Sequence, residues 1–69
     1  MIEPKGEASE TYTFVGLTVN GATRFMDIAV LCEADVEAHA RELLRQHDSS
    51  AQVEIWRSAE LVAVKKRPG

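Results

Sequence analysis

The sequence predicts an α+β domain in which four antiparallel strands and one helix follow the order ββαββ. Three observations lead to this prediction. An Asn20-Gly21 pair joins two runs of β-branched and aromatic residues, apolar residues recur at helical spacing from Val36 to His47, and residues 51–57 alternate strictly between apolar and polar. One helix packed on one face of a four-stranded antiparallel sheet accommodates all three patterns.

The first hairpin is expected from the strands Tyr12–Val19 and Ala22–Leu31. Asn-Gly tolerates positive φ at both central positions of a type I′ turn, which matches the twist of the flanking strands. Such a two-residue turn pairs the residues on either side of it and fixes the register of the whole hairpin. Gly16 then lies across from Phe25, where it either leaves room for the ring over bare backbone or marks a bulge.

A helix is expected over Ala34–His47, followed by a stop at Asp48-Ser49-Ser50. Acidic residues crowd its first turn, where the positive end of the helix dipole favours anions. Its apolar stripe consists of Val36, Ala40, Leu43, Leu44 and His47.

The second hairpin is expected from the strands Ala51–Arg57 and Leu61–Lys66. Ser58-Ala59 forms its turn, although neither residue adopts positive φ readily. The sequence leaves open which strands of the two hairpins are neighbours in the sheet.

Counting outward from the first turn separates the hydrophobic side chains into two sets on opposite faces. We expect the aliphatic set to form the core beneath the helix: Val15, Leu17, Met26, Ile28, Val30, Val53, Ile55, Val62 and Val64. The other face then carries every aromatic residue of the chain, with Leu61 and Leu31 beside them. This predicts an interface made of Tyr12, Phe14, Phe25, Trp56 and Leu61.

An uncovered aromatic face of this size requires a partner, and we expect a homodimer in which a second copy packs on it. Two alternatives stay open: the register differs, or the N-terminal residues fold over part of the face. A different protein could also occupy it. Because Asp27 and Glu54 fall on the same face, single-stranded RNA is the less favoured occupant.

Length and charge narrow the function classes. The 69 residues allow one domain, 11–67, preceded by a disordered tail, 1–10. The net charge of −3 argues against binding to a phosphate backbone. We expect no signal peptide and no membrane span, and the single cysteine favours a cytoplasmic location.

The residues that could carry chemistry are expected to have structural roles. His39 and His47 are eight positions apart, so they do not converge as metal ligands on one helix face. The acidic neighbours of Cys32 disfavour a thiolate, and no serine or cysteine has a histidine within evident reach. We therefore expect no enzyme activity, catalytic residue, cofactor or metal.

Two stretches, Glu33–Leu44 and Val53–Arg57 with the return strand Leu61–Val64, resemble small uncharacterised proteins of alphaproteobacteria. Those proteins share an acidic start to an alanine-rich helix and a Val-Glu-Val-Trp strand. The chain departs from them around Asn20-Gly21, where they commonly carry acidic residues. The resemblance implies the ββαββ order and a bacterial cytoplasm, and it transfers no activity and no functional residues.

The sequence thus predicts a non-catalytic protein-interaction module. The alternative from another class is a small acidic inhibitor or decoy, such as a phage-encoded antagonist of a nucleic-acid enzyme. The small size and the acidity of the chain also fit this alternative.

Overall fold

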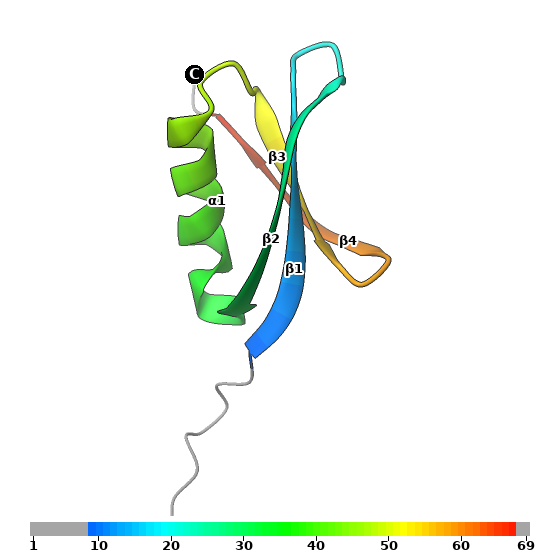
Figure 1. The fold of residues 1–69 in the computed structure, drawn as a ribbon, viewed down its shortest axis with the longest axis vertical. Coiled ribbons are helices and arrows are strands. Elements are labelled where there is room, and N and C mark those ends of the chain that lie inside the picture. Colours follow the sequence, from blue (N-terminus) through cyan, green and yellow to red (C-terminus); the bar gives the residue numbers. More distant parts are fainter. Residues whose placement is uncertain (1–8, 68–69) are drawn as a thin grey trace, which may run out of the picture.

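The computed structural model describes residues 9–67, which form one four-stranded antiparallel sheet and one α-helix (Figure 1). The elements are β1 (Ser9–Leu17), β2 (Thr23–Cys32), the 3-10 turn η1 (Glu33–Asp35), α1 (Val36–Gln46), β3 (Gln52–Arg57) and β4 (Glu60–Lys66). The predicted α+β fold and its ββαββ order are confirmed. Most of the predicted tail, 1–10, lies outside the described residues, while Ser9 and Glu10 belong to β1.

The strand order in the sheet is β2-β1-β3-β4, so the two hairpins join through the first strand of each. β1 and β3 pair antiparallel at the centre, and β2 and β4 are the two edges. Figure 1 shows the β1–β2 hairpin crossing the β3–β4 hairpin at an angle, with α1 on one side of the sheet.

The first turn is longer than predicted. The N–H of Thr18 donates to the carbonyl of Ala22, and the N–H of Gly21 donates to the carbonyl of Thr18, both at 2.9 Å. Gly21 has φ of +86°, whereas Asn20 does not have positive φ. The predicted two-residue type I′ turn is therefore wrong, and a three-residue loop with glycine in the left-handed region closes the hairpin.

A bulge in β2 cancels the effect of this longer loop on the register. Gly16 pairs with Phe25, but Leu17 pairs with Thr23, so Arg24 is the extra residue. Beyond the bulge, Val15 pairs with Met26 as predicted, and the register stays as predicted to the end of the hairpin. The faces of β1 and β2 were therefore sorted correctly, although the turn was not.

The side of the sheet that α1 covers is the opposite of the one predicted for the first hairpin. Phe14 pairs with Ile55 and Gly16 with Val53, which places the aromatic residues of β1 beside the apolar residues of β3. Together with α1 they form one buried core: Tyr12, Phe14, Val36, Ala40, Leu43, Leu44, Val53 and Ile55. Phe25, Ala29 and Leu31 pack against it and are partly buried.

Side-chain contacts hold α1 onto this face at both ends. His39 Nε2 lies 2.9 Å from Asp27 Oδ2 on β2, and its ring contacts Phe14 edge-on with centroids 4.7 Å apart. At the other end, the Arg67 guanidinium donates to the carbonyls of Leu44 and His47. An arginine at the negative end of the helix dipole both satisfies terminal carbonyls and has the favourable charge.

Candidate interaction surface

The face of the sheet opposite α1 has no element packed on it within the described part of the chain. We call it the open face. Side chains alternate between the two faces along each strand, so the residues between the core positions point to the open face. They are Thr13, Val15 and Leu17 on β1, Met26, Ile28 and Val30 on β2, Gln52, Glu54 and Trp56 on β3, and Val64 and Lys66 on β4. Cross-strand pairing places them in rows across the sheet, and two central rows are Ile28–Thr13–Trp56 and Met26–Val15–Glu54–Val64.

The predicted placement on the uncovered face is wrong for three residues of the aromatic interface. Tyr12 and Phe14 are buried beneath α1, and Phe25 packs against the same core, so none of them lies on the open face. Trp56 does lie there, half-buried, and Leu61 is opposite it at the start of β4 with 43% of its surface exposed. The large rings fill the space under a short helix, and burying them removes more apolar surface from water than burying aliphatic residues does.

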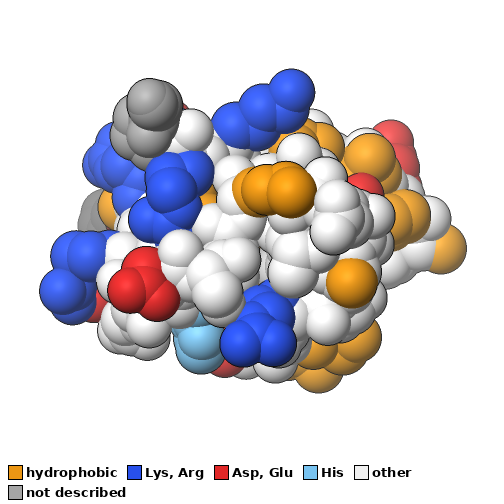
Figure 2. All heavy atoms as spheres, turned by 90° about the horizontal axis from the view of Figure 1, so that it is seen from above, with side chains coloured by type: hydrophobic (Ala, Val, Ile, Leu, Met, Phe, Trp, Pro, Cys, Tyr) orange, Lys and Arg blue, Asp and Glu red, His pale blue; other side chains and the backbone are white. Residues whose placement is uncertain are grey.

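The most exposed apolar residues of the open face lie in one line along the edge strand β2. Met26, Ile28 and Val30 are 64%, 64% and 66% exposed, although each is a large hydrophobic side chain in regular secondary structure. We call these three residues the β2 stripe. Figure 2, seen from above, shows hydrophobic side chains mainly on the side away from α1, and most of the visible lysine and arginine side chains on the helix side.

Charged groups are sparse on the open face. Among residues 9–67, its two charged residues are Glu54 and Lys66, and the Glu54 carboxylate accepts a hydrogen bond from Trp56 Nε1 at 3.2 Å. Lys65, one position earlier, points to the helix side, where it pairs with Glu37 at 2.9 Å. The result is a largely neutral apolar surface on a protein whose charges lie elsewhere.

The two edges of the sheet differ in how well they are protected against pairing with another strand. β4 has a register shift between Ile55 and Trp56 on its partner strand, which leaves Val62 as an extra residue, and it ends in two lysines. β2 is 10 residues long and pairs regularly with β1 from Phe25 to Cys32. Bulges and lysines discourage edge-to-edge association. β4 has both features and is protected, whereas β2 beyond its bulge has neither.

A second concavity lies on the helix side. An open groove of about 710 Å³ runs between the start of α1 and β4, with Tyr12 and Ile55 among its apolar lining residues. Four of its charged lining residues form ion pairs, Lys65 with Glu37 and Arg57 with Glu60. Arg57 also pairs with Glu10, and Glu33 is a further acidic residue of the lining. Both cations that line the groove in the described structure are therefore engaged in ion pairs, which makes it the weaker candidate site.

The titratable and nucleophilic residues contribute packing and hydrogen bonds in the described structure. His39 contacts Asp27, and His47 stacks on Phe25 with ring centroids 4.1 Å apart. Cys32 Sγ lies 3.8 Å from Ser9 Oγ. Among residues 9–67, no group of three or more histidine, cysteine or acidic side chains is arranged to hold a metal ion.

No known protein family, curated protein or solved structure matches this chain. None of the helices in the described residues has the length and apolar character needed to cross a membrane. The geometry of the open face therefore provides the basis for a functional proposal.

Proposed function

We propose that this chain is a non-catalytic protein-interaction module that self-associates through the open face. The observation that carries the proposal is the β2 stripe, in which three large apolar side chains are each about two-thirds exposed on one line. Burying one such side chain contributes roughly 1.5–3 kcal/mol. A contiguous apolar surface of this kind on a folded domain marks a site of association.

A second copy is the partner that the surface fits best. In a two-fold dimer the same patch meets itself, so a charged patch would repel its copy. The open face avoids that cost, because its charges are confined to Glu54 and Lys66, which have opposite sign. A 69-residue chain also has a small core, and sharing apolar surface with a second copy enlarges it.

The alternative role as an acidic decoy gains no specific support from the charge distribution. A decoy of nucleic acid would present a run of unpaired carboxylates to its enzyme. Instead, Glu37 pairs with Arg41 and Lys65, and Glu42 pairs with Arg45, so acidic groups along α1 are neutralised locally.

The mass of the protein in solution tests the proposal. We expect the wild type to have the mass of two chains at micromolar concentration by light scattering or sedimentation. Met26→Glu should weaken the dimer at least about tenfold, which corresponds to about 1.4 kcal/mol. The matched control is Val19→Glu, which adds the same charge at an apolar residue that is 83% exposed in the loop between β1 and β2, outside the strands that form the open face.

The control variant should keep the dimer mass and show the wild-type circular dichroism spectrum. A wild type with the mass of one chain across the accessible concentration range would overturn the proposal. Equal weakening by Met26→Glu and Val19→Glu would also overturn it, since only one of these positions lies on the open face.

A further inference from the structure

The hydrogen bonds of β1 determine which β2 residues direct their backbone N–H and C=O groups toward β1. The carbonyl of Leu17 accepts from Ala51 at the β3 side, whereas the N–H of Thr18 donates to Ala22 at the β2 side. Because backbone groups alternate in direction along a strand, the even-numbered residues of β1 face β2. Their partners, including Asp27 opposite Phe14 and Ala29 opposite Tyr12, use their backbone groups within the sheet.

The remaining β2 residues therefore direct their N–H and C=O groups to the free edge of the sheet. These residues are Met26, Ile28 and Val30, the same three whose side chains form the β2 stripe. Each of them presents an exposed apolar side chain together with a backbone donor and acceptor that no strand of the described chain satisfies. This combination is what an incoming strand requires, since backbone pairing gives affinity and alternate side chains pack on one face.

We propose that β2 pairs antiparallel with β2 of a second copy, in a register centred on Ile28. This inference rests on the proposed self-association and places the contact at the β2 edge of the open face, where the two β2 stripes meet. The pairing joins two sheets edge to edge into one sheet of eight strands. Directly opposed residues point to the same side, so both helices cover one face and the two β2 stripes lie side by side on the other.

Charge and side-chain size select this register among those that the backbone allows. Only residues with outward backbone groups can form the hydrogen-bonded pairs, which restricts the centre of symmetry. A centre on Asp27 would oppose two carboxylates directly, and a centre on Ala29 would set Asp27 against Leu31. The centre on Ile28 pairs Met26 with Val30 and sets Asp27 against the small Ala29, leaving room for its bond to His39.

Amide hydrogen exchange in the wild-type protein tests the edge pairing directly. In the proposed dimer the amides of Met26, Ile28 and Val30 are hydrogen-bonded and should exchange at least about tenfold more slowly than in dilute monomer. Val64 provides the internal control. Its partner Glu54 pairs with Val15, so the backbone N–H and C=O groups of Glu54 point to β1 and not to β4. The amide of Val64 therefore also points outward, at the other edge of the sheet.

A pair of proline variants separates the edge from the face. Ile28→Pro removes one outward N–H without removing a bond to β1, and proline is tolerated at such edge positions. Val64→Pro makes the matched change at the opposite edge and deletes an aliphatic side chain from the same open face. We expect Ile28→Pro to reduce the dimer to a monomer and Val64→Pro to leave the dimer mass unchanged, with circular dichroism reporting the fold of each.

The outcomes distinguish this inference from the proposal on which it rests. A wild type with dimer mass whose Met26, Ile28 and Val30 amides exchange as fast as that of Val64 would overturn edge pairing and leave association through the face intact. A monomeric wild type would overturn both. Loss of the dimer in Val64→Pro but not in Ile28→Pro would likewise overturn the edge pairing.

Discussion

The ring of Phe25 lies directly over the backbone of Gly16, its partner in the sheet. A Cβ at Gly16 would be 2.0 Å from Cε2 of the Phe25 ring, far inside van der Waals contact. The other side of the ring stacks on His47 at the end of α1, with an interplanar angle of 22°. The absent side chain of Gly16 is therefore what allows the ring to pack between the sheet and the helix.

Replacing Gly16 with alanine should destabilise the protein. The new methyl group forces the Phe25 ring out of its position against His47, and overpacking of this kind typically costs about 1–3 kcal/mol. In a domain of this size each kcal/mol lowers the melting temperature by about 4–8 °C. Thermal and chemical denaturation of Gly16→Ala and the wild type would measure the loss.

The ring contact itself is tested in a Phe25→Ala background. With the ring gone, adding Gly16→Ala should cost almost nothing, because the methyl group then enters vacated space. A double-mutant cycle isolates this coupling. If Gly16→Ala lowered stability equally in both backgrounds, the backbone conformation of Gly16 would be responsible instead of the contact with the ring.

The elements of this fold could be predicted because their signals are local. Apolar spacing marks the helix from Val36 onward, and strict alternation marks β3. The register of the first hairpin was predicted correctly beyond Gly16 only because the bulge at Arg24 offsets the extra loop residue. Loop and bulge have no separate sequence signal here, since Asn-Gly fits both kinds of turn.

Local sequence signals could not predict which face of the first hairpin lies beneath α1. It depends on the pairing of β1 with β3, a contact between segments far apart in the chain, for which the sequence contains no turn to count from. One residue pair did carry a usable signal. Asp27 shares the face of Phe14, and the helix side chain that contacts it is His39. That pairing places the rings beneath α1 and leaves the β2 stripe exposed.

Arg67 is expected to contribute to stability by capping α1. Its Nε donates to the carbonyl of Ser50 at 2.9 Å, and its Nη2 donates to those of Leu44 and His47 at 2.6 and 3.0 Å. Hydrogen bonds from a charged donor are each worth about 1.5–3 kcal/mol, and the group is only half-buried, so Arg67→Met should cost about 1–3 kcal/mol in total. Urea denaturation would measure the difference.

Lys66 supplies the matched control for this variant. It is adjacent and exposed, and its side chain is on the opposite side of β4, so Lys66→Met removes a positive charge without removing a cap. Arg67→Lys should recover only part of the loss, because an ammonium cannot reproduce the fork of the guanidinium. Equal effects of Arg67→Met and Lys66→Met would show that net charge, and not capping, determines stability here.

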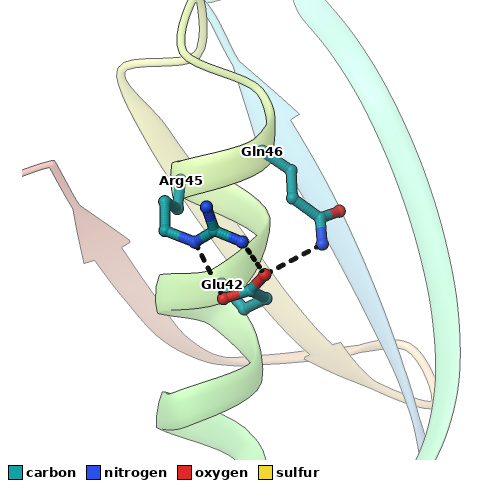
Figure 3. Close-up of polar contacts among 3 residues, drawn as sticks. All are labelled: Glu42, Arg45 and Gln46. Carbon is teal, nitrogen blue, oxygen red and sulfur yellow. Dashed lines mark hydrogen bonds and ion pairs between the residues drawn. The ribbon is translucent and has the colours of Figure 1, made fainter.

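The carboxylate of Glu42 should make the helix sensitive to acid. Arg45 donates to both of its oxygens, through Nε at 3.1 Å and through Nη2, and Gln46 Nε2 donates at 3.0 Å (Figure 3). These hydrogen bonds, with that of Arg45 the strongest, lower the pKa of Glu42 from 4.5 to about 2. A carboxylate whose pKa is lower in the folded state stabilises that state above the unfolded pKa. The stabilisation is therefore present at neutral pH and is lost as the pH falls from 4.5 to about 2.

Glu42→Gln isolates this contribution from that of the other carboxylates. The variant should be less stable than the wild type at pH 7, and the difference should shrink as the pH is lowered through 4.5 toward 2. Because the three side chains are exposed on the helix surface, the difference should be small and should also decrease in high salt. Melting temperatures of both proteins across this pH range, at low and high salt, provide the measurement. A difference that stayed constant from pH 7 to pH 2 would mean that glutamine is unfavourable at this position for a reason other than lost charge, such as its packing on the helix.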